Sequence, residues 1–172
     1  MKKFLLSTAV AGLLLAACSE EAPKEETTAP QEETTKEETT NVKADLMKFY
    51  MSIPNTINET DTDLNAYEGA IGDETADLAA LKEPAVTSAQ ETAAAVKGLE
   101  IPEALVDQKE TLETALADLV TIYEEKAAAI SADDTAKLEE TNAKYEEVDA
   151  TFNTLLEEQG LIPSSIYNEV TK

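Results

Sequence analysis

The stretch from Leu105 to Ile130, LVDQKETLETALADLVTIYEEKAAAI, decides the fold. Its apolar residues recur in steps of three and four, which is the spacing of one face of an α-helix. The stripe consists of Leu105, Lys109, Leu112, Leu116, Leu119, Tyr123, Lys126 and Ile130. A repeat close to 3.5 residues favours lengthwise, left-handed packing against other helices.

The same spacing returns in three more stretches, at residues 46–71, 78–99 and 138–159. Helix stop and start signals bound the four stripes. Gly72 and Gly160 end a helix, Pro102 stands where a new helix can begin, and the acidic residues at 131–134 cap the start of the last stripe. Connections this short make consecutive helices antiparallel. We therefore expect an all-α chain that folds as an antiparallel up-down-up-down four-helix bundle, with the tyrosines of the stripes (Tyr50, Tyr67, Tyr123 and Tyr145) in its core.

Two prolines and the C-terminal tail modify this picture. Pro54 and Pro84 fall inside the first and second stripes, where a missing N–H predicts a kink or a break. The tail at 164–172 places Ile166, Tyr167 and Val170 on one face, which is typical of a short helix. We expect this helix to cover one end of the bundle.

The N-terminus predicts export and a lipid anchor. Lys2 and Lys3 precede a charge-free run at 4–17, which is too short to span a bilayer but typical of a signal peptide. The residues LAAC, ending at Cys18, resemble the lipobox of bacterial lipoprotein precursors. This resemblance implies cleavage before Cys18, the single cysteine of the chain, and a diacylglyceryl (palmitate-type) anchor on its sulfur. The alternative is a secreted protein with a free thiol.

The segment at 18–41 carries the lipidated cysteine and a Glu/Thr-rich spacer. EETT occurs three times in it, at Glu25, Glu32 and Glu37, and its apolar residues are no larger than Ala or Pro. Such a composition cannot bury enough surface to offset the entropy of ordering, so we expect a disordered stalk. The domain organisation is thus a signal peptide (1–17), the anchored spacer (18–41) and a helical bundle (42–172).

The charge of the chain excludes one class of partner. It has 13 Lys and Arg residues against 36 Asp and Glu, a net charge of −23. Loss of the signal peptide removes two lysines, which leaves a charge of −25 on the mature chain. A surface this acidic repels nucleic acid, so no nucleic-acid partner is expected. Adjacent acids such as Glu139–Glu140 and Glu146–Glu147 point in divergent directions on a helix, and we expect them on the outer face.

The residue types present disfavour catalysis. The chain has no His, and its five glycines form no phosphate-binding pattern. We therefore predict a non-enzymatic protein without catalytic, cofactor-binding or metal-binding residues. The sequence Asp61-Thr62-Asp63-Leu64-Asn65 begins like a calcium loop, but Ala66 and Gly72 stand where that loop needs Gly and Glu. We interpret it as a helix with a solvated acidic face.

Three polar residues interrupt or flank the apolar stripes. Lys109 and Lys126 lie on the third stripe, and Asn142 lies beside the fourth. They can line a ligand pocket between helices. The alternative, which we favour, is that each lysine sits near an end of its stripe and extends its ammonium to solvent. Apolar replacement of both lysines is then expected to maintain or raise thermal stability.

The domain itself is similar to the small, acidic helical lipoproteins of Bacillus-like Gram-positive bacteria, on stretches such as Ser131-Ala132-Asp133-Asp134 and Thr141-Asn142-Ala143. This resemblance implies no activity and no site. We expect a monomeric, lipid-anchored domain on the extracytoplasmic face of the cell membrane that presents an interaction surface to an envelope protein or cell-wall partner. The alternative is a lipoprotein that binds a small ligand or peptide between its helices.

Overall fold

The computed structural model describes residues 32–171 and gives side chains from Val42 onward. Its elements are α1 (Glu32–Asn58), α2 (Thr62–Ala70), α3 (Leu78–Lys97), the 3₁₀ helix η1 (Glu103–Gln108), α4 (Lys109–Ser131), α5 (Thr135–Glu158) and α6 (Ile166–Val170). No strand occurs between residues 32 and 171, so the all-α prediction is confirmed for this part of the chain. The expected signal peptide, Cys18 and residues 19–31 lie outside the described residues.

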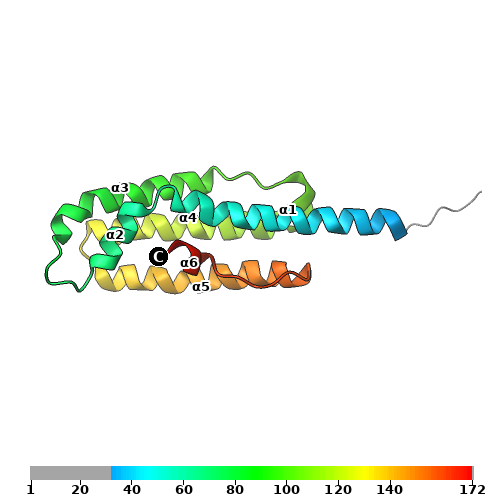
Figure 1. Cartoon of the computed structure of the whole chain (residues 1–172). Helices are drawn as coiled ribbons and strands as arrows, with labels where there is room; N and C mark the ends of the chain where they lie inside the picture. Colours follow the sequence, from blue (N-terminus) through cyan, green and yellow to red (C-terminus); the bar gives the residue numbers. More distant parts are fainter. Residues whose placement is uncertain (1–31, 172) are drawn as a thin grey trace, which may run out of the picture. The chain divides into compact units, whose positions relative to one another are not determined.

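The long helices α1, α3, α4 and α5 lie lengthwise beside one another (Figure 1). The chain passes along α3, turns back along α4 and turns again along α5, while α2 packs on α3. Within residues 32–171 no helix is both long and apolar enough to cross a bilayer.

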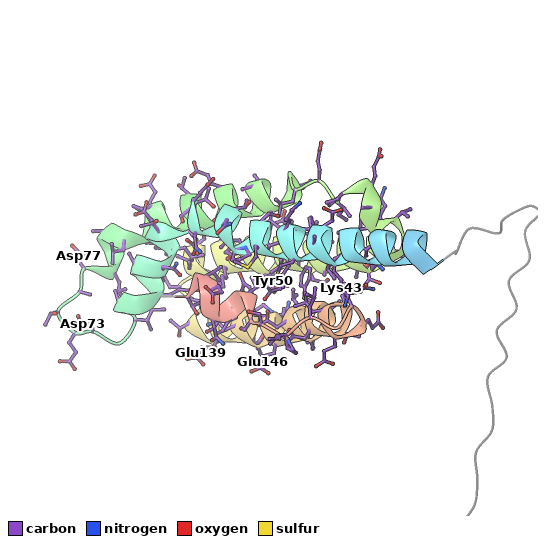
Figure 2. All side chains as sticks on the ribbon, turned by 45° about the vertical axis from the view of Figure 1, so that its right-hand side comes forward. Lys43, Tyr50, Asp73, Asp77, Glu139 and Glu146 are labelled. Atoms are coloured by element: carbon purple, nitrogen blue, oxygen red, sulfur yellow. The ribbon has the colours of Figure 1, made fainter. Side chains whose placement is uncertain are left out.

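The predicted stripes form the core. Most of their apolar positions are buried, including all four predicted core tyrosines, and the largest fully buried side chains include Tyr50, Tyr123, Tyr145, Phe152, Leu112 and Leu119. Tyr50 meets Phe152 edge to face, with ring centroids 5.7 Å apart, which joins α1 to α5. Such aromatic pairs add about 0.5–1.5 kcal/mol beyond the area they bury. The acid pairs of α5 are exposed as expected, and Figure 2 shows Glu139 and Glu146 at the outer edge of the domain.

The helix α1 begins earlier than predicted. We expected disorder up to Asn41, yet residues 32–41 continue the helix toward its N-terminus (Figure 1). Extending a helix that is already nucleated by packing costs far less than starting one. Glutamate is also a good helix former, and its charge is favourable near the positive N-terminal end. The Glu/Thr-rich sequence cannot form a core of its own, but it can extend a helix that is already packed.

The apolar stripe at 46–71 is split into two helices, but not at the position that Pro54 predicted. Pro54 and Pro84 both lie inside continuous helices, so neither breaks its helix. The chain turns instead at Thr60 and Asp61, between α1 and α2. Ser88 of α3 stabilises this turn, because its hydroxyl donates to the Thr60 carbonyl (2.6 Å) and accepts from the Leu64 amide (3.3 Å). One buried hydroxyl thus serves backbone groups on both sides of the break.

The tail forms the predicted short helix but in another place. In α6, Ile166 and Val170 are buried and Tyr167 is half-buried. We expected α6 at an end of the bundle. It packs instead between α1 and α5, after the chain has run back along α5 from Gly160 (Figure 1). The positive φ of Gly160 (64°) allows this reversal directly after α5.

Candidate functional site

The three residues considered for an alternative ligand pocket do not form one pocket. Lys109 and Lys126 are 17 positions apart on α4, which corresponds to about 25 Å along the helix axis. Asn142 lies on α5, one turn before Tyr145. Its side-chain oxygen is buried and has no hydrogen-bond partner among the described residues.

Lys109 borders an open groove at the junction of α3, η1 and α4, which we call the Lys109 groove. Its volume is about 590 Å³, and it is lined by Val96, Lys97, Leu99, Glu100, Ile101, Glu103, Lys109, Glu113, Leu116, Ala117 and Val120. The Lys109 ammonium lies 3.7 Å from Glu113 and its side chain is 57% exposed. This exposure agrees with the interpretation that Lys109 extends to solvent. The groove combines partly buried aliphatic side chains with two ammonium groups and three carboxylates.

Lys126 behaves differently from our expectation. We expected it to reach solvent, but its side chain is only 2% exposed and its Nζ donates to Glu68 Oε1 at 2.5 Å. Nζ also lies 5.8 Å from the ring centroid of Tyr145, within the range of a cation–π attraction. The expectation was wrong because α2 brings the Glu68 carboxylate over this part of α4. Sequence periodicity missed Glu68, which follows Tyr67 and lies just off the first stripe.

Asp61 is a buried carboxylate near this ion pair. We interpreted residues 61–65 as a helix with a solvated acidic face; α2 does include Thr62 to Asn65 and Asp63 is exposed, but Asp61 is 3% exposed. Burial raises the pKa of Asp61 to about 6, against the hydrogen bond from Asn65 and the charge of Lys126, which lower it. Asn65 Nδ2 donates both to Asp61 Oδ2 (3.0 Å) and to the Val170 carbonyl (2.8 Å). Asn65 therefore links Asp61 to the end of α6.

The raised pKa of Asp61 predicts a specific pH dependence of stability. A carboxyl with an ordinary pKa of 3.8 and a folded pKa of about 6 favours the folded state when protonated. Its contribution is complete below about pH 4 and is lost as the pH rises through about 6. We therefore expect the unsubstituted chain to lose thermal stability between pH 4 and pH 7. Asp61→Asn should remove this loss.

Thermal melts of both chains at pH 4 and pH 7 measure this difference. Asp63→Asn, at the exposed neighbouring carboxylate, is the matched control and should retain the unsubstituted pH dependence. Equal pH dependence in Asp61→Asn and Asp63→Asn would show that Asp61 has an ordinary pKa.

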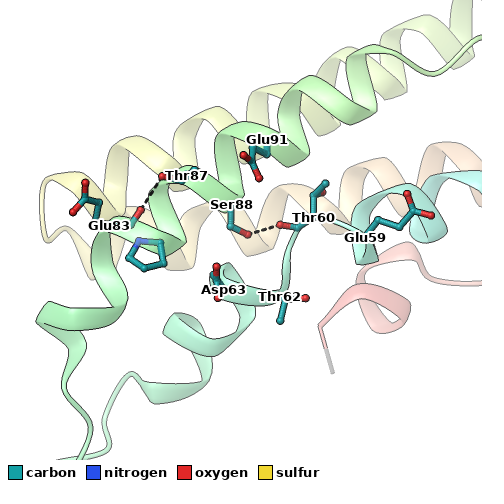
Figure 3. Close-up of a pocket in the computed structure, with 9 residues that line it drawn as sticks. Glu59, Thr60, Thr62, Asp63, Glu83, Thr87, Ser88 and Glu91 are labelled. Atoms are coloured by element: carbon teal, nitrogen blue, oxygen red, sulfur yellow. Dashed lines mark hydrogen bonds between the residues drawn. The ribbon is translucent and has the colours of Figure 1, made fainter.

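A second groove, between α2 and α3, is acidic (Figure 3). It measures about 490 Å³, and its carboxylates come from Glu59, Asp63, Glu83 and Glu91. Two of its hydroxyl groups are engaged within the protein, since Ser88 donates to the Thr60 carbonyl and Thr87 donates to the Glu83 carbonyl. Among the side chains that the structure describes, from Val42 onward, no three acidic, His or Cys groups lie together so as to hold a metal ion. This groove adds to the negative potential of the surface.

No protein-family model, curated protein or solved structure matches this chain.

Proposed function

We propose that this chain is a lipid-anchored extracytoplasmic protein whose helical domain presents an interaction surface at the cell envelope and catalyses no reaction. In this proposal Cys18 carries a diacylglyceryl group, and the domain is an antiparallel up-down-up-down bundle of α1, α3, α4 and α5. The lipobox-like residues before Cys18 and the chain reversals in Figure 1 support these two statements. The charge of −25 on the mature chain favours a domain held away from anionic headgroups.

The observation that carries the interaction role is the Lys109 groove. Leu99, Ile101 and Val120 are only partly buried there, on a surface that is otherwise rich in carboxylates. Small-molecule sites enclose most of their ligand's surface, whereas this groove is open along the helices. An open groove with an aliphatic floor and a charged rim suits a protein or peptide partner, because the fully buried centre of an interface is apolar and its rim is polar.

The alternative function, binding of a small ligand or a peptide between the helices, is favoured by Lys109 itself. An ammonium at the rim of an aliphatic groove is suited to an anionic group on an otherwise apolar ligand. The two functions predict different effects of the Lys109 charge on binding. A broad interaction surface gains little from one exposed charge, whereas an anionic ligand depends on it.

Affinity capture from envelope extracts, with the unsubstituted domain and a Lys109→Met variant, separates these functions. We expect the variant to retain its captured partner with unchanged affinity. Lys137→Met is the matched control, because Lys137 is also an exposed lysine paired along its own helix, with Glu140. A stable Lys109→Met variant that loses a partner retained by Lys137→Met would make the chain a ligand-binding protein instead.

A further inference from the structure

The C-terminal segment lies in a groove that recognises it. Residues 159–171, which we call the strap, follow α5 and run back along it, and α6 then packs between α1 and α5 (Figure 1). The surface beneath α6, which we call the strap groove, is formed by α1, α2 and α5. Side chains of these helices bind both ends of α6.

The N-terminal end of α6 is bound by α5. Asp149, which is buried, accepts from the Ser165 hydroxyl (2.7 Å) and from the Ile166 amide (2.8 Å). One turn further along α5, Asn153 Oδ1 accepts from the Ser164 amide (2.9 Å). A carboxylate at the N-terminal end of a helix meets unpaired amides and the positive end of the helix dipole.

The C-terminal end of α6 is bound by α1 and α2. Asn58 Nδ2 donates to the Glu169 carbonyl (3.3 Å), and Asn65 Nδ2 donates to the Val170 carbonyl (2.8 Å). These contacts are to the backbone of the strap, as in grooves that bind short peptides. Specificity then comes from the two side chains that enter the core, Ile166 (0% exposed) and Val170 (2% exposed).

The exposed connection to the strap favours release. Ile162, Pro163 and Ser164 are exposed, and the Ile162 side chain is 84% exposed.

We propose that the strap is exchangeable, and that the strap groove of one copy accepts the strap of a second copy of this chain. The contacts that Ser164 to Val170 make with the groove all come from the strap itself, so a strap from another copy presents the same atoms to the groove. The seven residues 159–165 reach about 23 Å when extended. That reach allows the exchange that is typical of domain swapping. This inference gives the domain a second surface, separate from the Lys109 groove, whose partner is another copy of the chain, and the lipid anchor is not required for it.

The test mixes two full-length variants, each with Cys18→Ser so that neither a lipid nor a disulfide forms there. The first carries Ile166→Asp and Val170→Asp, which disable its strap and leave its groove open. The second carries Asp149→Ala and Asn65→Ala, which disable its groove and leave its strap intact. We expect each variant alone to sediment as a monomer, and the equimolar mixture to form a species of twice the monomer mass.

A matched control replaces Ile162 by Asp in the first variant in place of the two core substitutions. Ile162 belongs to the strap but is exposed, so this chain should keep its strap and form no dimer in the mixture. Hydrogen exchange of residues 164–171 reports whether each strap is released. Released straps without a dimer in the mixture would overturn the proposal, and so would straps that stay protected in both variants.

A second measurement avoids substitutions in the core. Asn153→Cys in one chain and Ser164→Cys in another, both with Cys18→Ser, place thiols at positions that are in contact when a strap is bound. If the strap exchanges between copies, the mixture should oxidise mainly to the disulfide-linked heterodimer. Heterodimer and homodimers in the proportions of random collision would contradict exchange.

Discussion

Replacing Lys126 by Met should lower the free energy of unfolding by about 3–5 kcal/mol. Lys126 is 2% exposed and its ammonium binds the Glu68 carboxylate, whose side chain is 16% exposed. The substitution leaves that carboxylate and the nearby Asp61 without the positive charge they face. For Lys126 this reverses the expectation from the sequence that apolar replacement maintains or raises stability, because that expectation took its ammonium to reach solvent. Urea denaturation followed by circular dichroism at pH 7 measures the loss.

Removing both members of the pair should reverse most of this effect. In Lys126→Met with Glu68→Leu no unpaired charge of the pair remains, and apolar replacement of a buried ion pair is often neutral or stabilising. The exposed pair of Lys137 and Glu140 is the control, and Lys137→Met should change stability by less than about 1 kcal/mol. A loss below about 1 kcal/mol in Lys126→Met alone would show that Glu68 does not depend on Lys126 in the folded chain.

Replacing Phe152 by Ala should cost about 3–5 kcal/mol of unfolding free energy. Phe152 is fully buried and its ring meets Tyr50 edge to face, so the substitution opens a cavity and removes a contact between α1 and α5. Thr154→Ala, at an exposed position of the same helix, is the control and should be nearly neutral. Urea denaturation of the two variants gives the comparison, and equal stabilities would mean that Phe152 is not a core residue.

Periodicity predicted the elements that bury a continuous apolar face. The stripe at 105–130 is η1 and α4, and the stripe at 138–159 is α5, because repeated apolar residues at helical spacing have one stable solution in water. The break at Thr60 depends on a hydroxyl of Ser88, 28 positions later in the chain. No local pattern predicts a contact of that separation.

The candidate site was less predictable for a similar reason. The stripe located Lys126 and Lys109 correctly on one helix, but their surroundings come from other elements. The neighbour of Lys126 is Glu68 of α2, and that of Lys109 is the open groove beside η1. The position of α6 depends on Asp149 and Asn65, which are distant in sequence from each other and are ordinary surface residue types.

The most direct test of the proposed function is the mass of the mature protein isolated from the membranes of a bacterial host. We predict a chain that begins at Cys18, lacks residues 1–17 and carries a diacylglyceryl group on the Cys18 sulfur, with no acyl labelling in a Cys18→Ser variant. Such a mass would place the helical domain outside the cytoplasm on a lipid anchor. A chain that retains residues 1–17, or one with an unmodified Cys18 thiol, would contradict the account.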